Sequence, residues 1–287
     1  METRTDFRRF NVGSLECVAI SDGSFTYPTA NFFPGAPPDL LAAAFGSPDA
    51  PPPQITSPYT CLAVKVDDQW VLLDTGAAGM GPTTGNLQTN LQASGIRPSD
   101  VATVVLTHAH PDHIGGVVGT DGMLAFPHAK LLMTKQEWDY WSAPNLFSRL
   151  PPHLPEMARE RQTRTFLSRL PALEPTVTLI DGETEVARGM RVLLAPGHTP
   201  GHAVVQLTSR RESLLYISDT LLHPIHLAHP DWHPVYDMDP AQAEVTRRHI
   251  LTQITNQGML VFAFHFPFPG VGRIRWDGQA SSWEPAI

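Results

Sequence analysis

Cysteine and long apolar runs are both scarce in this chain of 287 residues. Its only two cysteines, Cys17 and Cys61, cannot form a disulfide framework and do not make a Cys-x-x-Cys metal pair, so we expect two buried free thiols. No run of about 18 uncharged apolar residues occurs that could cross a membrane, and residues 1–10 lack the apolar segment of a signal peptide. These absences predict a soluble, cytoplasmic protein with no membrane partner.

Basic residues are also in the minority, because 20 Lys and Arg stand against 28 Asp and Glu, for a formal net charge of -8. They are scattered along the chain, which argues against a nucleic-acid partner and favours a small-molecule substrate. A chain of this length with 42% hydrophobic residues can bury about three quarters of its unfolded surface. We expect one domain over residues 1–287, with an N-terminal extension over about residues 1–58.

Short apolar runs with strand character occur in both halves of the chain, separated by helical segments. The strand candidates are Leu15–Ser21, Thr60–Leu73, Val101–Leu106, Leu131–Met133, Val177–Ile180, Arg191–Leu194, Ala203–Leu207, Leu214–Ile217 and Met259–Phe264. The helix candidates are Asn86–Ser94, a helix opened by the capping box Thr134–Glu137, much of Pro144–Pro175, and Pro240–Asn256. Phe32–Pro58, dense in proline and alanine, reads as an ordered surface excursion. This pattern predicts an α/β fold of four layers, with two facing sheets and helices outside.

Potential metal ligands follow several of these strands. The stretch "THAHPDHIGG" at residues 107–116 comes directly after an apolar strand candidate, and three later runs also end on histidine or aspartate. One buried histidine is usually a satisfied core residue, but a set gathered at strand ends indicates a metal site. The candidates are His108, His110, Asp112, His113, His198, Asp219 and His265.

The first part of this set offers nitrogen ligands. In His108-x-His110 a two-residue step from an extended strand end turns both rings to one side, where His198 can complete a three-nitrogen site. Imidazole and carboxylate ligands suit zinc, manganese or iron, and a catalytic ion keeps one position open. Gly115 and Gly116 would let the next helix start close to the ions without a Cβ in the way.

The second part is expected on the opposite side. Asp112 and His113 point toward His265, and Asp219 can bridge two ions. Five neutral imidazoles and two carboxylates leave two divalent ions with an excess of positive charge, which favours a bound hydroxide. Such water has a pKa of about 7 and is a nucleophile at neutral pH. The implied reaction is hydrolysis of an ester, lactone or phosphoester, with Asp219 and Asp112 as the candidate catalytic carboxylates.

The ordered motifs resemble the metallo-β-lactamase fold superfamily. They are "LLDTG" at 72–76, "HAHPDH" at 108–113, "GHTPGH" at 197–202, "SD" at 218–219 and "FH" at 264–265. The resemblance implies an αβ/βα sandwich with two divalent ions at one edge of the two sheets. Zinc is the first expectation for these ions, and manganese, iron and cobalt are the alternatives. It also implies the division of ligands described above, with Asp74 orienting one of them.

Within the superfamily, "LECVAISDGSFTYP", "LLDTGAAGMGPTTGNLQTNLQASGI" and "FPFPGVGRIR" resemble the methyl parathion hydrolase group, which is similar to bacterial lactonases and arylesterases. Trp141 falls where that group has an aromatic residue in its leaving-group pocket. Phe33, Phe147 and Phe268 are further pocket candidates, with core packing as the alternative for each. Leu222 is a further candidate for substrate contact. It stands where acyl-homoserine lactonases carry a tyrosine, so their phenolic donor is missing there. Pairing among relatives suggests a homodimer.

Four histidines lie in "HPIHLAHPDWHP" at residues 223–234, just after the candidate bridging aspartate. One interpretation is a proline-rich loop over the mouth of the site. The other gives His223 or His226 a catalytic role, as proton donor to the leaving group or as a contact to a substrate oxygen.

The leading hypothesis is therefore a dinuclear metallohydrolase acting on a lactone, an aryl ester or an organophosphate triester. The alternatives are a mononuclear iron oxidoreductase of the persulfide dioxygenase type, a thioester hydrolase, and a metal-dependent binding protein without turnover. Departures from the patterns of other superfamily branches narrow the choice. No cysteine beyond Cys61 is present for a thiolate ligand, and only 22 residues follow His265, so an added glutathione-binding helical domain does not fit.

Overall fold

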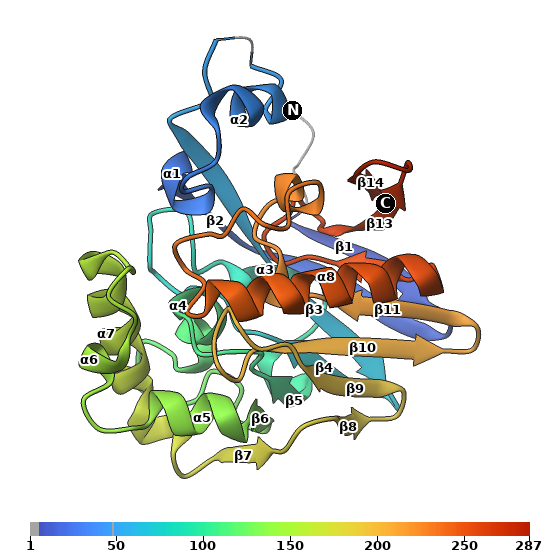
Figure 1. Ribbon diagram of the computed structural model, residues 1–287. Helices are drawn as coiled ribbons and strands as arrows, with labels where there is room; N and C mark the ends of the chain where they lie inside the picture. The colour runs from blue at the N-terminus through green and yellow to red at the C-terminus, as the bar shows by residue number, and fades with distance from the viewer. Residues whose placement is uncertain (1–5, 48) are drawn as a thin grey trace.

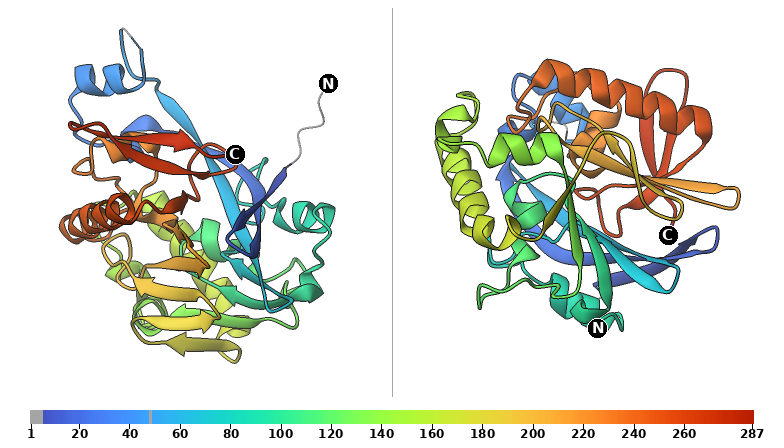
Figure 2. Two further views of the ribbon diagram at one scale, coloured as in Figure 1. Left: turned by 90° about the vertical axis from the view of Figure 1, so that its right-hand side faces the viewer. Right: turned by 90° about the horizontal axis from the view of Figure 1, so that it is seen from below.

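The computed structural model describes residues 6–47 and 49–287. It contains two seven-stranded sheets, with the orders β1-β2-β3-β4-β5-β6-β7 and β14-β13-β12-β11-β10-β9-β8. Helix α3 (Leu87–Ala93) lies outside the first sheet and helix α8 (Pro240–Gln257) outside the second, as the view from below in Figure 2 shows. The predicted four-layer αβ/βα sandwich is thus confirmed.

The first sheet begins as an antiparallel meander and continues with parallel strands. Its strands are β1 (Phe7–Val12), β2 (Leu15–Pro28), β3 (Gln54–Val66), β4 (Gln69–Leu73), β5 (Val101–Val105), β6 (Lys130–Thr134) and β7 (Val177–Ile180). Pairing is antiparallel from β1 to β4 and parallel from β4 to β7. Parallel neighbours need crossover connections. These connections carry α3, α4 (Pro111–Ile114), α5 (Lys135–Trp141), α6 (Leu146–Arg149) and α7 (Glu156–Leu173).

The second sheet is antiparallel except at one pair. Its strands are β8 (Thr184–Ala187), β9 (Met190–Leu194), β10 (Ala203–Ser209), β11 (Glu212–Tyr216), β12 (Leu260–Phe262), β13 (Val271–Trp276) and β14 (Ser281–Pro285). Strands β11 and β12 are parallel, and α8 makes the crossover between them (Figure 1). Short 3-10 turns occupy Pro98–Asp100, Gly115–Val117, Ser218–Thr220 and Pro224–Leu227.

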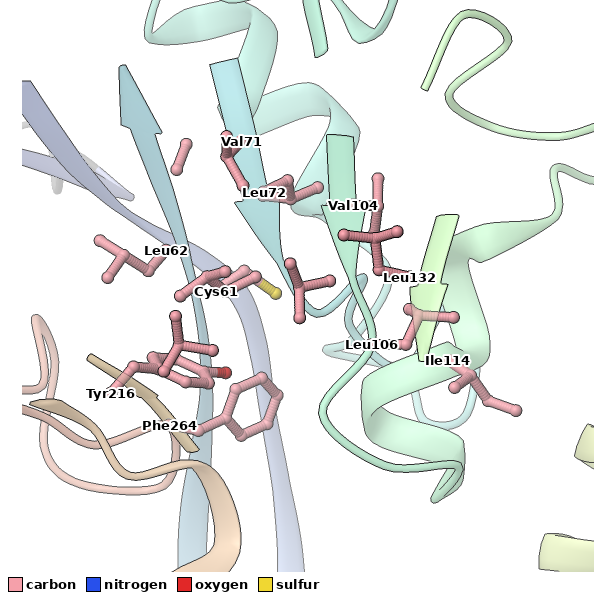
Figure 3. Close-up of a cluster of buried hydrophobic side chains, with 14 of the residues drawn as sticks. Cys61, Leu62, Val71, Leu72, Val104, Leu106, Ile114, Leu132, Tyr216 and Phe264 are labelled. Atoms are coloured by element: carbon pink, nitrogen blue, oxygen red, sulfur yellow. The ribbon is translucent and has the colours of Figure 1, made fainter. Parts of the chain in front are cut away.

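The main core fills the space between the sheets. Figure 3 shows Leu72 of β4 and Val104 of β5 in this cluster, with Tyr216 and Phe264 approaching from the second sheet. Cys17 and Cys61 are both buried and free, as predicted. Burial raises the pKa of the Cys17 thiol to about 12, so it is not ionised at neutral pH.

The strand predictions near the N-terminus were too short. Strand β2 runs on to Pro28 and β3 starts at Gln54, because these two segments pair with each other after a register shift between Ser21 and Gly23. Gly23 has φ +118, and a Cβ there would lie 1.7 Å from the Thr83 carbonyl oxygen. Glycine therefore permits the bulge that lets the long hairpin bend.

The excursion between these two strands is ordered in the part that the structure describes, and it carries α1 (Thr29–Phe32) and α2 (Pro38–Ala44). Figure 1 shows α2 projecting beyond the two sheets. No helix among the described residues is long and apolar enough to span a bilayer.

Candidate metal centre

All seven predicted ligands lie at the ends of strands that open on the same edge of the sandwich. The loop after β5 carries His108 and His110, and α4 follows from Pro111. Proline suits the first position of a helix because its missing N–H needs no partner there. Helix α4 adds two more candidates, and segments after β9, β11 and β12 add the rest. The added residues are Asp112, His113, His198, Asp219 and His265.

The two glycines after α4 have a different neighbour from the one expected. A Cβ on Gly115 would lie 2.6 Å from the carbonyl carbon of Ala77, and one on Gly116 would lie 2.1 Å from the carbonyl oxygen of Thr75. The glycines therefore permit close packing of α4 on the loop that contains Asp74. They do not clear space toward the ligands themselves.

The ligand candidates form two groups. His108, His110, His198 and Asp219 each offer one atom within 4.8 Å of the others, and Asp112, His113 and His265 form a second such group. The structure thus brings the candidate ligands together in the same two groups that sequence analysis expected.

The Asp219 carboxylate lies between the two groups. One oxygen, Oδ2, is 3.3 Å from Nε2 of His198 and 3.2 Å from Nε2 of His265. The other, Oδ1, is 3.0 Å from Nε2 of His113. Because each side contributes imidazole nitrogens to the same carboxylate, its position fits a ligand shared by two cations.

Several of these atoms are buried without a hydrogen-bond partner. They are Nε2 of His108, His110 and His113, and Oδ1 of Asp219. The 3.0 Å approach between the last two atoms does not have the geometry of a hydrogen bond. A buried polar atom left unpaired costs roughly 1–3 kcal/mol, so such atoms need an explanation. Nitrogen and oxygen lone pairs converging on two points are a donor set that divalent transition metals satisfy. The residues present therefore fit two divalent ions.

Neighbouring side chains fix the orientation of the second group. Nδ1 of His113 lies 2.8 Å from Oδ2 of Asp74, and Asp74 also accepts hydrogen bonds from Thr107 and from the Tyr216 hydroxyl. This contact is the one predicted from the "LLDTG" turn. Nδ1 of His265 lies 2.9 Å from the Ser57 hydroxyl, a partner that no sequence pattern indicated.

A buried ion pair orients the first group. Nδ1 of His198 lies 3.0 Å from Oδ1 of Asp237, and the other oxygen of Asp237 accepts from Arg247 at 2.9 Å. Both side chains of this pair are almost completely buried. Partners of this type fix the tautomer and the direction of a metal-binding imidazole. Sequence reasoning missed the pair, since Arg247 lies within α8 and reads as an ordinary helix residue.

Electrostatics also prepare the site for cations. Burial, assisted by the imidazole of His113, holds the pKa of His108 well below its usual range, and burial with His198 does the same for His110. Both rings are therefore neutral at pH 7, which is the form that binds a metal. Burial disfavours the charge on Asp219, but His113 and His265 outweigh it and keep its pKa well below the ordinary value.

A family model described as the metallo-beta-lactamase superfamily matches residues 56–265. The chain belongs to this superfamily. The resemblance predicted from the motifs is confirmed, and the matched region runs from β3 to the last candidate ligand.

Curated relatives in the superfamily are distant and cover part of their own length. An N-acyl homoserine lactonase of Bacillus cereus is 23% identical over 181 residues, which are 56% of this chain and 62% of that protein. A probable metallo-hydrolase of Mycobacterium bovis is 30% identical over 183 residues, 56% of each chain. The chain thus spans less than two thirds of the length of these relatives.

Two solved superfamily structures match nearly the whole chain. AidC, a dizinc quorum-quenching lactonase in complex with the product N-hexanoyl-L-homoserine, has 28% identity and a TM-score of 0.86, covering 98% of this chain and 97% of its own. The hydrolase AbOPH of the β-lactamase superfamily has 26% identity and a TM-score of 0.87, covering 100% and 99%.

A cavity of about 320 Å³ opens beside the two ligand groups. Its walls are largely apolar and include Phe25, Tyr27, Phe32, Leu222 and Tyr236. Five of the seven candidate ligands border it, namely His110, Asp112, His198, Asp219 and His265. A mostly apolar cavity with a few convergent polar groups is typical of a small-molecule site.

None of the four aromatic pocket candidates lines this cavity. Trp141 is fully buried, its indole Nε1 donates to Glu137, and its ring meets His110 edge-on at 5.7 Å. Phe33 packs in a separate buried cluster with Trp232. Phe147 is 37% exposed under Arg159, and Phe268 is partly buried outside the lining. Only Leu222, of the residues proposed for substrate contact, lies on its wall.

The loop histidines at 223–234 have structural partners of their own. Nδ1 of His223 accepts from the Ile225 backbone, and His226 is fully buried with Nε2 3.1 Å from the Phe32 carbonyl oxygen. His229 stacks on Trp232 at 3.8 Å, and His233 bonds to Glu244. None of the four lines the cavity. Their contacts are to this loop, to the excursion and to α8, which favours the interpretation of a proline-rich loop over a catalytic role for His223 or His226.

His202, the last residue of "GHTPGH", supports the backbone of Asp219. Its Nδ1 lies 2.9 Å from the Ala195 carbonyl oxygen, and its Nε2 accepts from the Asp219 N–H at 3.1 Å. Only the neutral ring can do both, and burial lowers its pKa to about 3. Sequence analysis did not single out this residue.

Acid should therefore destabilise the metal-free protein through His202. Below its ordinary pKa of 6.5 the unfolded chain takes up a proton that the folded ring refuses until about pH 3. Stability falls as the pH drops through this window, by up to about 1.4 kcal/mol per pH unit for one group. Urea unfolding of chelator-treated protein measures the slope. His202→Gln, which keeps an acceptor but does not titrate, should flatten it, and an unchanged slope would contradict the assignment.

Proposed function

We propose that this chain is a dinuclear metal-dependent hydrolase that opens lactones and cleaves aryl esters or phosphotriesters. The observation that carries the proposal is the position of the Asp219 carboxylate between two groups of buried ligands, within 3.3 Å of imidazole nitrogens from both. A mononuclear centre would need only one group.

The ligand roles follow from the two groups. We assign one ion to His108, His110 and His198 and the other to Asp112, His113 and His265, with Asp219 shared. Two divalent ions held there, zinc in the first instance, would supply a water of lowered pKa and would polarise the substrate oxygen. The chain's own contribution is to hold the imidazoles correctly turned, through Asp74, Asp237 and Ser57.

The cavity supports an uncharged substrate with an apolar part. Phe25, Phe32 and Leu222 form apolar wall, and Arg161 is the only Lys or Arg among the described residues that line the cavity. Lactones, aryl esters and phosphotriesters are neutral and bury apolar surface, which suits such walls. The similarity to AidC, whose structure holds N-hexanoyl-L-homoserine, favours the lactone within this range.

Tyr236 can supply the hydrogen-bond donor that Leu222 lacks. It lines the cavity with Leu222, and its oxygen accepts from Asn31 Nδ2 at 3.0 Å, which leaves the phenol proton free to point at substrate. Burial raises its pKa to about 12, so the phenol stays protonated at neutral pH. We assign it to the substrate's carbonyl or phosphoryl oxygen, where charge develops in the transition state.

Tyr236→Phe should lower kcat/KM for a lactone by about 10- to 100-fold, because one donor to the developing negative charge is lost. Metal content should not change. Tyr140→Phe is the matched control, since that hydroxyl donates to the Arg149 carbonyl oxygen away from the cavity. Equal rates for the two variants would remove Tyr236 from the mechanism.

A substrate panel with metal analysis tests the function. Protein purified without added ions is analysed for metals and then assayed on a dihydrocoumarin-type lactone, an aryl ester, a paraoxon-type triester and an acyl thioester. We expect two divalent ions per chain and turnover of at least one of the first three substrates. One iron per chain with oxygen consumption would favour the persulfide dioxygenase type. Turnover of thioesters alone would favour that hydrolase class, and full metal occupancy without any turnover would favour a binding protein.

A further inference from the structure

Glu137 is a fully buried carboxylate that makes hydrogen bonds to both loops of the first ligand group. Its Oε1 accepts from the Ala109 backbone N–H at 2.8 Å, between His108 and His110. Its Oε2 accepts from the Thr199 hydroxyl at 2.7 Å and from the Gly201 N–H at 3.0 Å, just after His198. These loops are about ninety residues apart in sequence, and one side chain ties them together.

This arrangement differs from the capping box that the sequence predicted. The Thr134 hydroxyl accepts from the Glu137 N–H and so caps α5. The Glu137 side chain, however, does not return to the Thr134 backbone but turns inward to the ligand loops. A glutamate that only capped a helix would be exposed, whereas this one is 0% exposed.

Three further contacts attach α5 and its capping residue to the two ligand loops. The Thr134 hydroxyl donates to the Gly201 carbonyl oxygen at 2.6 Å. A Cβ on Gly201 would lie 2.1 Å from the Glu137 backbone nitrogen, so this loop packs directly on the start of α5. Trp141 donates its indole N–H to Glu137 at 2.7 Å and meets the His110 ring.

We propose that Glu137 is a positioning residue that sets the spacing between the His108–His110 loop and His198, and so controls metal affinity at the first ligand group. The inference rests on the metal centre of the proposed function. Nδ1 of His110 and Nε2 of His198 lie 2.9 Å apart, so the two loops must be held at a close, fixed separation. The second group has separate supports in Asp74 and Ser57.

Glu137 does not touch the substrate cavity. It is absent from the cavity lining, and both of its oxygens already accept two hydrogen bonds each. It therefore acts through the ligand loops, and its loss should change one metal site more than the other. If Glu137 had a purely structural role, its loss would lower the stability of the fold and would weaken the two metal sites to the same degree.

The test is a metal titration of Glu137→Gln in the full chain. The substitution replaces one carboxylate oxygen by an NH2 group, which is a donor. This donor would face the N–H or O–H groups that the oxygen accepted from, so the hydrogen bonds to one ligand loop are lost. Binding of zinc and cobalt is followed by calorimetry, cobalt absorption bands and anomalous scattering from each site. We expect affinity at the first group to fall by about 10- to 100-fold, while the second group keeps its affinity.

Asp22→Asn is the matched control. Asp22 is also fully buried and accepts from the backbone N–H groups of Ala77, Gly85 and Leu87. Its loss should lower the melting temperature without weakening metal binding at the first ligand group, because the loop that it holds at Ala77 packs on α4. If Glu137→Gln binds both ions like the unaltered chain, or weakens both equally, the proposal is overturned.

Thr199 provides a milder pair of variants should Glu137→Gln fail to fold. Thr199→Ala removes one donor to Glu137 and should weaken the first site by several-fold, and Thr199→Ser, which keeps the hydroxyl, should restore it. No difference between these two would overturn the proposal. An unaltered chain that binds two ions but turns over no substrate defeats the proposed function and leaves this inference standing.

Discussion

Asp219→Ala should reduce turnover of a dihydrocoumarin-type lactone and of a paraoxon-type triester by at least about a thousandfold. The substitution removes the one carboxylate that lies within 3.3 Å of imidazoles from both ligand groups. Without it, the two ligand groups would hold two cations with no carboxylate shared between them. A metal centre stabilises the transition state by several kcal/mol. Because about 1.4 kcal/mol corresponds to a tenfold change in rate, losing this stabilisation lowers turnover by at least about a thousandfold.

Steady-state rates and metal content are measured together for this variant. We expect fewer than two ions per chain and the same far-ultraviolet circular dichroism spectrum. Asp231→Ala, an exposed aspartate in the neighbouring loop, serves as control and should keep full activity. Survival of both rates in Asp219→Ala would show that the mechanism does not run through the shared carboxylate.

The gathering of the candidate ligands could be predicted from the sequence because strand ends converge on one edge of the sandwich. A strand of apolar residues followed by histidine or aspartate fixes where that side chain emerges, whatever the rest of the chain does. His108 and His110 illustrate this, since their two-residue spacing after β5 places both in one group. The layers were predictable for a related reason, because apolar strand runs and amphipathic helices must bury their apolar faces against each other.

The partners that orient these ligands could not be predicted in the same way. Asp237, Ser57 and Glu137 carry no sequence signal of this role, which depends on segments distant in sequence that pack against them. Glu137 even matched a local pattern, the capping box, that describes only its backbone. Local rules of this kind are overridden where a buried polar group has stronger partners from tertiary structure.

The cavity walls were the least predictable part. Trp141 was expected to face substrate, but α5 turns its indole toward Glu137 and beneath His110. Tyr236, which does line the cavity, lies in a loop after the histidine-rich segment, where no periodicity indicates direction. The lengthening of β2 and β3 also shifted residues such as Tyr27 from a presumed loop into a strand that borders the cavity.

Removing the metals should lower the melting temperature by at least about 10 °C. Without ions, the Nε2 atoms of His108, His110 and His113 are buried without partners, so the folded state carries their desolvation cost. An ion present at a hundred times its dissociation constant adds about 2.7 kcal/mol of stability per site. Each kcal/mol corresponds to a shift of about 2–4 °C in a chain of this size.

Differential scanning calorimetry before and after dialysis against a chelator measures this shift, with elemental analysis to confirm that the ions are gone. Restoring zinc should recover both the melting temperature and the activity. Asp219→Ala should show a smaller shift on chelation, because it starts with weaker ion binding. A melting temperature that stays constant through complete metal removal would mean that the seven side chains are satisfied without ions, and the assignment of the site would then be wrong.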